Sequence, residues 1–554
     1  MAVHTGAEHT LPLRPIPDFL DETVRRFGER TGVDFLGRTW RWREIGRTVE
    51  RVAVGLAALG VGKGTRVGLC LPNTPYYLIA YFAVLRLGGT VVNFNPLYVE
   101  RELADQVRDS GTTIMVTLDL KMIFDKVEAL HRKGLLERIV VCPMADILPF
   151  VKRWLFRLFK RGERASIPRD AAHVAFADLA RSHGHPAPVA IDIHTDIAVL
   201  QYTGGTTGIP KAAVLTHANL CANAEQVRAA FPGARPGEER LLAVLPFFHV
   251  FGMTVLQNYS VASGTELVML PRFELGMLFK AVARTRPTLL PGVPTLFAAV
   301  AGAHQAQTID MTSIRYCFSG GAPLPAEIKA QFEGLTGCTL VEGYGLTEAA
   351  PVVSVNPLDG VNKIGSIGLP LVGTRVAVRD LDDGERLLDV GERGEIVVSG
   401  PQVMRGYWNR PGESEAVLRD GWLGTGDVGY IDEDGYIFLV DRIKDLIICS
   451  GFNVYPRVIE EALYRHADVA EATVIAVPDS YRGQVPKAFV RRVEGATVTE
   501  AELHEFLAGH LSKIEMPRTI EFRLVLPKTL VGKLSKKELV EEEAQRHADG
   551  AGSD

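Results

Sequence analysis

Hydrophobic positions in the first 300 residues alternate between helical and strand spacing. From Trp42 to Leu59 apolar residues recur at the spacing of one helical face, and the pattern ends at Gly60. Short apolar runs bounded by turn residues indicate strands, and the same alternation recurs from 198 to 294. The first elements we expect are helices over 42–59 and 75–87 and strands over 66–71 and 91–93. Strands alternating with helices predict parallel-type sheets covered by helices, which is an α/β fold.

The pattern changes after about residue 365. Short strands separated by Asp-Gly turns, such as Asp383-Gly384 and Asp434-Gly435, predict a small β-rich subdomain over about 365–440. A compact α+β segment of roughly 100 residues follows from Arg442. The last stretch, 541–554, is polar, and we expect it to be frayed.

Length and composition limit the class of protein. A chain of 554 residues is too long for one ordinary core, so two or more domains are expected. A net charge of −5 argues against nucleic acid as a partner. The six cysteines are scattered without a C-x-x-C pair, which is typical of reduced packing residues in a cytoplasmic protein. The N-terminus lacks the apolar core of a signal peptide, and we find no apolar run long enough to span a membrane.

The segment 146–162 departs from these patterns. On a helix, its apolar residues fall on one face, namely Ile147, Val151, Trp154, Leu155 and Leu158. Its basic residues flank that face, namely Lys152, Arg153, Arg157, Lys160 and Arg161. The pattern fits a helix lying on an anionic membrane surface, which would add peripheral contact with the inner face of the cell membrane. A helix packed on its own domain, with solvated basic residues, is the alternative.

The loop 201–211 reads QYTGGTTGIPK and lies between strand patterns at 197–200 and 212–215. Glycines let backbone N–H groups approach a ligand, hydroxyls add donors and Lys211 adds charge, so the composition suits a polyphosphate. The spacing is not that of a Walker A loop, which would open a helix. A mobile hairpin is the ordinary alternative.

Five further segments contain candidate chemistry, and each has an ordinary alternative. His249 lies in an apolar aromatic run, where a core histidine is common. The turn 319–325 and the segment 342–348 follow strands, where α/β proteins bind ligands, although Glu348 is also suited to a helix N-terminus. Asp427, with the pair Asp441-Arg442, could bind hydroxyl groups or form surface ion pairs. Lys533 lies in LPKTLVGKLS near other lysines.

In this order, the motifs over about 200–537 resemble the adenylate-forming enzymes, which include acyl-CoA synthetases, peptide-synthetase adenylation domains and luciferases. Two stretches, NPLY at 95–98 and DLIICSGFNVYP at 445–456, look like bacterial long-chain fatty-acid–CoA ligases. The resemblance covers nearly the whole chain. It implies a large N-terminal domain over 1–440, a hinge over 441–444 with Lys444 as the hinge residue, and a mobile C-terminal domain over 445–554.

The resemblance also implies roles for particular residues. Nucleotide binding falls to the phosphate loop, the adenine-binding turns, the ribose-binding pair and the C-terminal lysine, which are Thr203, Gly204, Gly205, Thr206, Thr207, Gly208, Lys211, Gly320, Gly321, Ala322, Glu342, Gly343, Tyr344, Gly345, Thr347, Asp427, Arg442 and Lys533. Thr203 and Glu348 would hold Mg²⁺. Lys533, Glu348 and His249 are the implied catalytic residues, with His249 bordering the acyl site. Gly451 would pass the pantetheine arm of CoA.

The implied reaction joins an acid to CoA in two halves. A long-chain fatty acid reacts with ATP to give an acyl-adenylate and pyrophosphate, and the CoA thiol then displaces AMP. ATP, Mg²⁺ and CoA are therefore the expected cofactors and co-substrates. One alternative is a ligase of the same fold for medium-chain or aryl acids, or for a carrier-protein acceptor. The other is a catalytically dead relative that binds lipid or nucleotide at a membrane. The sequence leaves open whether the protein forms a homodimer.

Overall fold

The computed structural model describes residues 3–7, 10–203, 210–303, 308–450, 452–479, 481–529 and 534–551, with side chains up to residue 546. Two separate hydrophobic cores are present among the described residues. The larger core draws on residues from Ile16 to Ile437, and the smaller on residues from Ile447 to Leu539.

The first sheet has seven strands and is parallel except at one edge, where β10 pairs antiparallel with β9. Its order is β10 (Lys211–Thr216), β9 (Ile197–Thr203), β5 (Thr90–Asn93), β4 (Arg66–Cys70), β6 (Ile114–Leu118), β7 (Arg138–Cys142) and β8 (His173–Ala175). Its connecting helices are α3 (Pro75–Arg86), α4 (Glu100–Ser110) and α5 (Lys121–Arg132), and α7 (Phe176–Leu179) follows β8.

The second sheet has nine strands, with a parallel centre and antiparallel edges. Its order is β17 (Leu369–Pro370), β16 (Val352–Val355), β15 (Thr339–Gly345), β14 (Tyr316–Ser319), β13 (Leu289–Gly292), β11 (Arg240–Ala243), β12 (Glu266–Met269), β2 (Thr31–Phe35) and β3 (Arg38–Arg41). The helices of this region are α1 (Pro17–Phe27), α2 (Trp42–Ala58), α8 (His217–Ala229), the π-helix η3 (Gly252–Asn258), α9 (Tyr259–Ser263), α10 (Leu275–Thr285), α11 (Pro294–Ala301) and α12 (Ala326–Thr336). The predicted α/β fold is confirmed.

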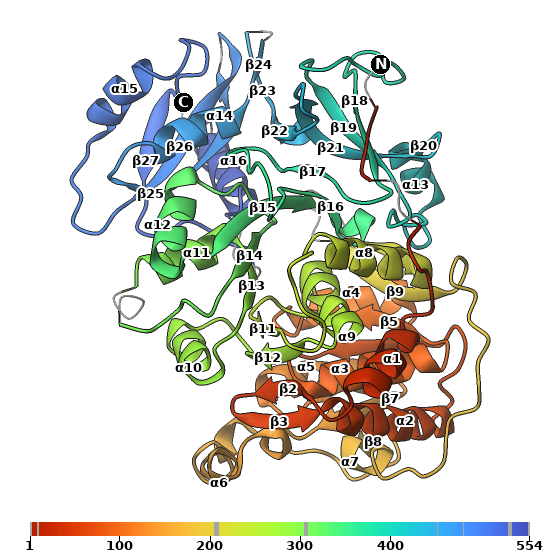
Figure 1. Ribbon diagram of the computed structural model, residues 1–554. Coiled ribbons are helices and arrows are strands. Elements are labelled where there is room, and N and C mark those ends of the chain that lie inside the picture. Colours follow the sequence, from red (N-terminus) through yellow and green to blue (C-terminus); the bar gives the residue numbers. More distant parts are fainter. Residues whose placement is uncertain are drawn as a thin grey trace.

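Except for β17, the strands of the β-rich region after residue 365 up to Arg442 form a third sheet (Figure 1), and the N-terminal strand β1 (Val3–Thr5) completes its edge by pairing with β18. Its other strands are β18 (Arg375–Arg379), β19 (Gly394–Ser399), β20 (Leu418–Arg419), β21 (Trp422–Ile431) and β22 (Ile437–Arg442), and α13 (Pro411–Val417) precedes β20.

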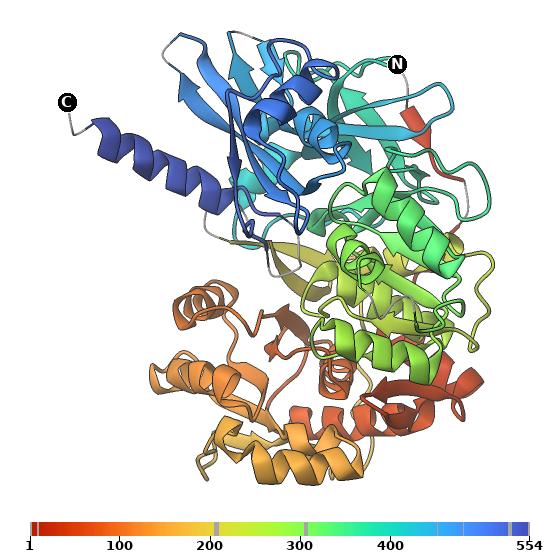
Figure 2. The ribbon, with the colours of Figure 1, turned by 90° about the vertical axis from the view of Figure 1, so that its left-hand side faces the viewer.

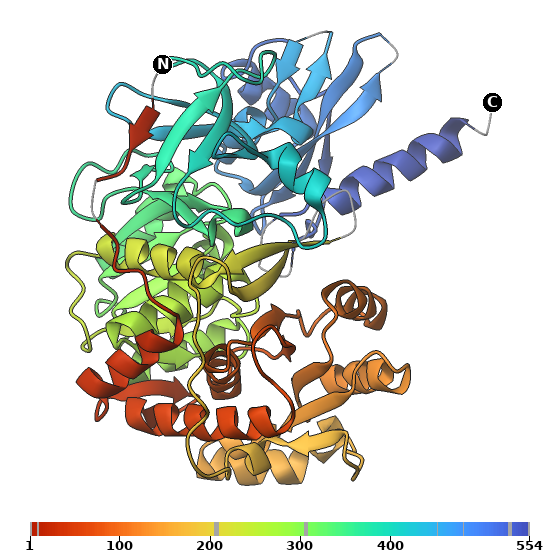
Figure 3. The same ribbon diagram turned by 90° about the vertical axis from the view of Figure 1, so that its right-hand side faces the viewer.

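The smaller core belongs to a fourth sheet of five strands. Its elements are β23 (Ile447–Cys449), β24 (Phe452–Val454), α14 (Pro456–Tyr464), β25 (Val469–Asp479), β26 (Gly483–Arg492), α15 (Glu500–Ala508), β27 (Thr519–Phe522) and α16 (Lys537–Ala551). The prediction of a frayed tail is wrong for residues 541–551, because they belong to α16, which projects from the side of the molecule (Figures 2 and 3). Residues 552–554 of the predicted tail lie outside the described residues. Arg546 pairs with Glu521, Glu542 and Glu543, and Leu539 is buried, so ion pairs and an apolar anchor stabilise this helix.

The unusual segment forms a short 3₁₀ helix, η1 (Met144–Ile147), and then helix α6 (Phe150–Phe159) at the margin of the molecule (Figure 1). The predicted apolar face is wrong in one residue, because Ile147 lies before α6 and is buried. In α6 itself no residue is buried, and Val151, Trp154 and Leu158 are each about two-thirds exposed. Across the described ranges, no helix is long and apolar enough to span a bilayer. All six cysteines are free and buried.

Candidate active site

The parallel strands β14 and β15 end at the same sheet edge and carry two of the predicted motifs. The turn Gly320-Gly321-Ala322 follows β14 directly, and Gly321 has a φ of +85°. The second motif differs from the prediction, because residues 342–345 belong to β15 itself and only Thr347 and Glu348 follow it, in a short 3₁₀ helix. A Cβ at Gly343 would lie 2.5 Å from the ring of Phe318, so a glycine here allows β14 and β15 to pack closely.

Asp427 joins this edge to the β-rich sheet. Antiparallel pairing of β21 and β22 sets Asp427 opposite Arg442, whose Nε donates to its carboxylate at 3.0 Å. The hydroxyl of Tyr344 donates to the other carboxylate oxygen. Burial, with the charge of Asp427, raises the pKa of Tyr344 well above its ordinary value and keeps the phenol protonated. Tyr344, Asp427 and Arg442 are therefore brought together, as the resemblance implies for one nucleotide site.

Glu348 and Lys211 are linked by a residue that the motifs did not indicate. The hydroxyl of Tyr407 donates to Glu348 Oε1 at 2.8 Å, and Lys211 Nζ lies 5.3 Å from the centre of the Tyr407 ring. Lys211 also forms an ion pair with Glu413. Thr203 ends β9 and its hydroxyl donates to Lys211 O at 3.3 Å. No local pattern distinguishes Tyr407 from an ordinary half-buried tyrosine, so only the tertiary fold reveals it.

His249 is half-buried just before a helix, and its Nδ1 accepts a hydrogen bond from Phe251 N at 3.2 Å. The π-helix η3 follows, a rare geometry that is frequent at functional sites. Gln201 fixes the neighbouring backbone, since its Nε2 donates to Phe248 O at 3.0 Å and its Oε1 accepts from Asn93 at 2.8 Å. These hydrogen bonds connect β9, the strand that precedes the predicted phosphate loop, to the segment that contains His249.

The donor set fits a magnesium ion. Thr203 offers a hydroxyl and Glu348 a carboxylate, both hard oxygen ligands, and Mg²⁺ in nucleotide sites takes one or two protein ligands with phosphate oxygens and waters. Groups of three or more His, Cys, Asp or Glu that could form an all-protein metal cage are absent from the part of the chain that the structure describes.

The segment between the two cores contains Asp441 and Lys444. Asp441 accepts hydrogen bonds from Arg442 N and Arg457 N, each at 2.8 Å, while the Arg442 side chain reaches Asp427, so Asp441 and Arg442 are not a surface ion pair. Burial raises the pKa of Asp441 to about 6. Lys444 lies in a 3₁₀ turn over Ile443–Asp445. The predicted residues Gly204, Gly205, Thr206, Thr207, Gly208, Gly451 and Lys533 lie outside the described residues.

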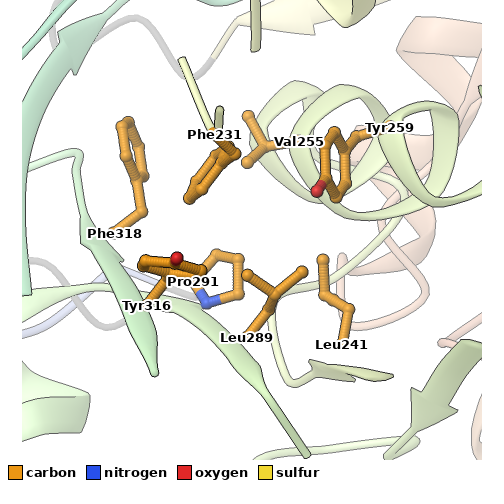
Figure 4. Close-up of a pocket in the computed structure, with 8 residues that line it drawn as sticks. All are labelled: Phe231, Leu241, Val255, Tyr259, Leu289, Pro291, Tyr316 and Phe318. Carbon is orange, nitrogen blue, oxygen red and sulfur yellow. The ribbon is translucent and has the colours of Figure 1, made fainter. Parts of the chain in front are cut away.

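A narrow apolar pocket lies behind Phe318, between the nine-stranded sheet and the helices over it (Figure 4). It leaves no space for a water molecule and is lined by Phe231, Leu241, Val255, Tyr259, Leu289, Pro291, Tyr316 and Phe318. Phe318 packs edge-on against Phe251 at 5.7 Å, beside Gly320. This closely packed space is adjacent to the predicted nucleotide site, and in this conformation it has no room for a ligand.

Known proteins are similar to this chain over nearly its whole length. A long-chain-fatty-acid–CoA ligase of Bacillus subtilis is 42% identical over 97% of both chains, and a feruloyl-CoA synthase of an Amycolatopsis species is 36% identical over 92% of this chain and 95% of its own. The crystal structure of ATP-bound MatB from Rhodopseudomonas palustris superposes with a TM-score of 0.83 at 29% identity, covering 95% of this chain and 98% of that one.

Two family matches cover most of the chain. Residues 20–408 match the family described as AMP-binding enzyme, and residues 458–533 match the AMP-binding enzyme C-terminal domain. The resemblance drawn from the motifs is confirmed, and this chain belongs to the AMP-binding enzyme family.

Proposed function

We propose that this protein is an AMP-forming ligase that activates a long-chain fatty acid with ATP and transfers the acyl group to CoA. The observation that carries the proposal is the meeting of Tyr344, Asp427 and Arg442 at the strand edge that also bears Glu348. The similarity to a long-chain-fatty-acid–CoA ligase supports the choice of acid and acceptor.

The chemistry needs cations where two anions meet. A carboxylate oxygen of the acid attacks the α-phosphorus of ATP, and the bond to pyrophosphate breaks. The thiolate of CoA then attacks the acyl carbon and AMP leaves. Lys211 would bind the phosphates, Asp427 and Arg442 the ribose hydroxyls, and Lys533 the reacting carboxylate. Mg²⁺, held by Thr203 and Glu348, would neutralise phosphate charge.

We expect the acyl chain to enter an apolar tunnel whose mouth is formed by residues 249–253 and 320–322. Each buried methylene contributes roughly 0.8 kcal/mol, so kcat/KM should rise steeply with chain length until the tunnel is filled. The test is CoA consumption with acids of increasing length, together with acid-dependent ATP–pyrophosphate exchange. A flat response, or a preference for acetate, would reject the long-chain substrate while leaving the adenylate chemistry intact.

An aryl acid is the second candidate substrate. A relative at 36% identity is a feruloyl-CoA synthase, and the rings of Phe251 and Phe318, centred 5.7 Å apart, lie beside Gly320 at the expected mouth of the tunnel. Ferulate in the same assay separates the two candidates, since a higher kcat/KM with ferulate than with any fatty acid would favour an aryl acid as the substrate.

We propose further that residues 441–444 are a hinge about which the C-terminal domain, 445–554, rotates between the two half-reactions. Lys533→Ala should abolish pyrophosphate exchange and spare thioester formation from supplied acyl-AMP, since the cation is needed only while the carboxylate attacks phosphorus. Lys444→Pro should do the reverse, because proline fixes φ and stiffens the hinge. Equal loss of both half-reactions in either variant contradicts its assigned role.

We propose that α6 makes peripheral contact with an anionic membrane. Its apolar side chains are exposed, and Lys152, Arg153 and Arg157 lie among them. Each basic residue near an anionic surface contributes about 1 kcal/mol, and salt screens this attraction. A long-chain acid partitions into membranes, so such contact would bring the enzyme to its substrate.

Co-sedimentation with vesicles tests this contact. The variant in which Arg153, Arg157, Lys160 and Arg161 are changed to glutamine should bind anionic vesicles much more weakly than the unaltered protein at low salt. Equal binding of the two proteins, or no binding of the unaltered one, would mean that α6 is only a surface helix.

A further inference from the structure

Residues 404–408 run antiparallel to β10 and form one isolated bridge with it, at Tyr407. Val214 N donates to Gly406 O at 2.9 Å and Trp408 N donates to Ala212 O at 2.8 Å. Tyr407 is thereby paired with Ala213, two residues beyond Lys211. The backbone of Tyr407 is fixed by the same strand that carries the phosphate-binding lysine.

A second set of bonds holds this segment from the side of α4. Trp408 Nε1 donates to Asp109 O at 3.1 Å, and Arg410 donates to the Asp109 carboxylate at 2.8 Å. The other oxygen of that carboxylate accepts the hydroxyl of Tyr202, also at 2.8 Å, on the strand that enters the loop. Tyr407 is therefore held at both ends of its segment, and its ring position is set by structure that lies outside the motifs.

Tyr407 touches both charged groups of the nucleotide site. Its hydroxyl donates to Glu348 Oε1, and its ring faces the ammonium of Lys211. Met404 N donates to Glu348 O at 2.7 Å, so the same segment also holds the backbone of Glu348.

We propose that Tyr407 is a positioning residue that aims the Glu348 carboxylate at the divalent cation. The phenol hydrogen bond occupies one carboxylate oxygen and fixes the rotation of the group, so the other oxygen remains for the cation. The face of the same ring meets the Lys211 ammonium, so one side chain contacts both groups. This inference rests on the proposed function of the site.

The test separates metal binding from nucleotide binding. Binding of Mn²⁺, as a probe for Mg²⁺, is followed by electron paramagnetic resonance with a non-hydrolysable ATP analogue and no fatty acid. Tyr407→Phe should weaken Mn²⁺ binding roughly tenfold to a hundredfold, the effect typical of losing a residue that orients a metal ligand. Its affinity for the analogue without metal should stay unchanged, whereas Tyr407→Leu, which also removes the ring, should weaken both.

A matched control lies in the same β-rich region. The hydroxyl of Tyr436 donates to Val361 O and Lys363 Nζ lies 4.6 Å from its ring centre, so Tyr436→Phe removes the same kind of bond beside the same kind of cation. It should leave Mn²⁺ binding unchanged. Thermal melting verifies that each variant is folded.

A double-mutant cycle tests whether Tyr407 acts through Glu348. In a Glu348→Gln background, Tyr407→Phe should have no further effect on Mn²⁺ binding. Additive effects, or unchanged or tighter Mn²⁺ binding in Tyr407→Phe alone, overturn the proposal. Lack of acid-dependent pyrophosphate exchange by the unaltered protein would instead reject the proposed function. Mn²⁺ binding could still be measured in that case, so the two failures are distinguishable.

Discussion

Helices α3 and α6 are both rich in apolar residues, yet their surroundings are opposite. In α3, over Pro75–Arg86, every residue except Arg86 is buried, and Tyr77 donates hydrogen bonds to Asn93 in β5 and to Phe247 O in the turn after β11. In α6, over Phe150–Phe159, no residue is buried. The difference lies in the charges, because α3 has one at its end and α6 has three within it. Apolar content alone therefore does not tell what covers a helix, whereas basic residues inside the run exclude a core position.

The proposed nucleotide site departs from the usual pattern in the opposite way, because it has buried acidic residues. Glu342 and Asp427 are acidic residues that are nearly fully buried at the strand edge, where an ordinary core would be apolar. Buried acids and exposed aromatic residues both reduce stability or solubility unless a ligand or a surface meets them. We propose that the buried acids lie at a nucleotide-binding site and that the exposed aromatic residues of α6 contact a membrane.

The largest contrast should appear in stability. Phe82 is fully buried in α3 and packs edge-on against Tyr81, so Phe82→Ala should lower the free energy of unfolding by about 3–5 kcal/mol. Phe159 is 73% exposed, so Phe159→Ala should change it by less than about 0.5 kcal/mol. Chemical denaturation measures both. A similar loss in the two variants would mean that α6 is packed in solution.

The buried acids should give the next largest effect, as a pH dependence. Burial raises the pKa of Glu342 from 4.5 to about 7, so its stabilising contribution is present below pH 4.5 and is lost as the pH rises through 7. This pKa shift corresponds to a free energy of unfolding that is lower by roughly 3 kcal/mol above pH 7 than below pH 4.5. Glu342→Gln should therefore be more stable than the unaltered protein at pH 8 and should lose this dependence. Parallel pH profiles from denaturation at pH 5 to 8 would contradict the assignment.

The sequence predicted local features better than contacts across the fold. The helix expected over 42–59 is α2, and the strands expected on either side of the phosphate loop are β9 and β10. Tyr407 could not be found, because its partner Glu348 lies 59 residues away and only sheet packing brings them together. The pairing of β1 with β18 likewise joins residues 3–5 to 375–377. Ile147 was misplaced because the helix begins three residues later, a boundary that periodicity does not fix.

The apolar face of α6 should give a smaller effect, confined to membranes. Trp154→Ala with Leu158→Ala should weaken vesicle binding by roughly 2 kcal/mol, or about 30-fold, because shallow insertion buries only part of each side chain. Stability in solution should be unchanged, since both residues are about two-thirds exposed. Co-sedimentation with vesicles measures the binding. The matched pair Val361→Ala with Ile364→Ala, also exposed but far along the chain, should have no effect on it.

The smallest effect should come from Asp146, which offsets part of the basic charge of α6. Its Oδ1 accepts hydrogen bonds from Arg153 and Arg157, each at 2.9 Å. Asp146→Asn removes one negative charge and frees both guanidinium groups for lipid phosphates. Binding to anionic vesicles should become stronger by about 1 kcal/mol, or roughly fivefold, at low salt, and the gain should vanish at high salt.

The control for this change is Asp380→Asn, which breaks a similar surface pair with Arg386 in the β-rich sheet. It should not affect vesicle binding, because that sheet lies at the opposite end of the molecule from α6 (Figure 1). Weaker vesicle binding in Asp146→Asn would mean that the ion pairs orient the helix more than they neutralise it. Unchanged binding in Asp146→Asn, at a salt concentration where the unaltered protein binds, would mean that the basic face of α6 does not reach the lipid. After either result, only the effect of the apolar side chains of α6 on vesicle binding would support membrane contact as the reason why α6, unlike α3, is exposed.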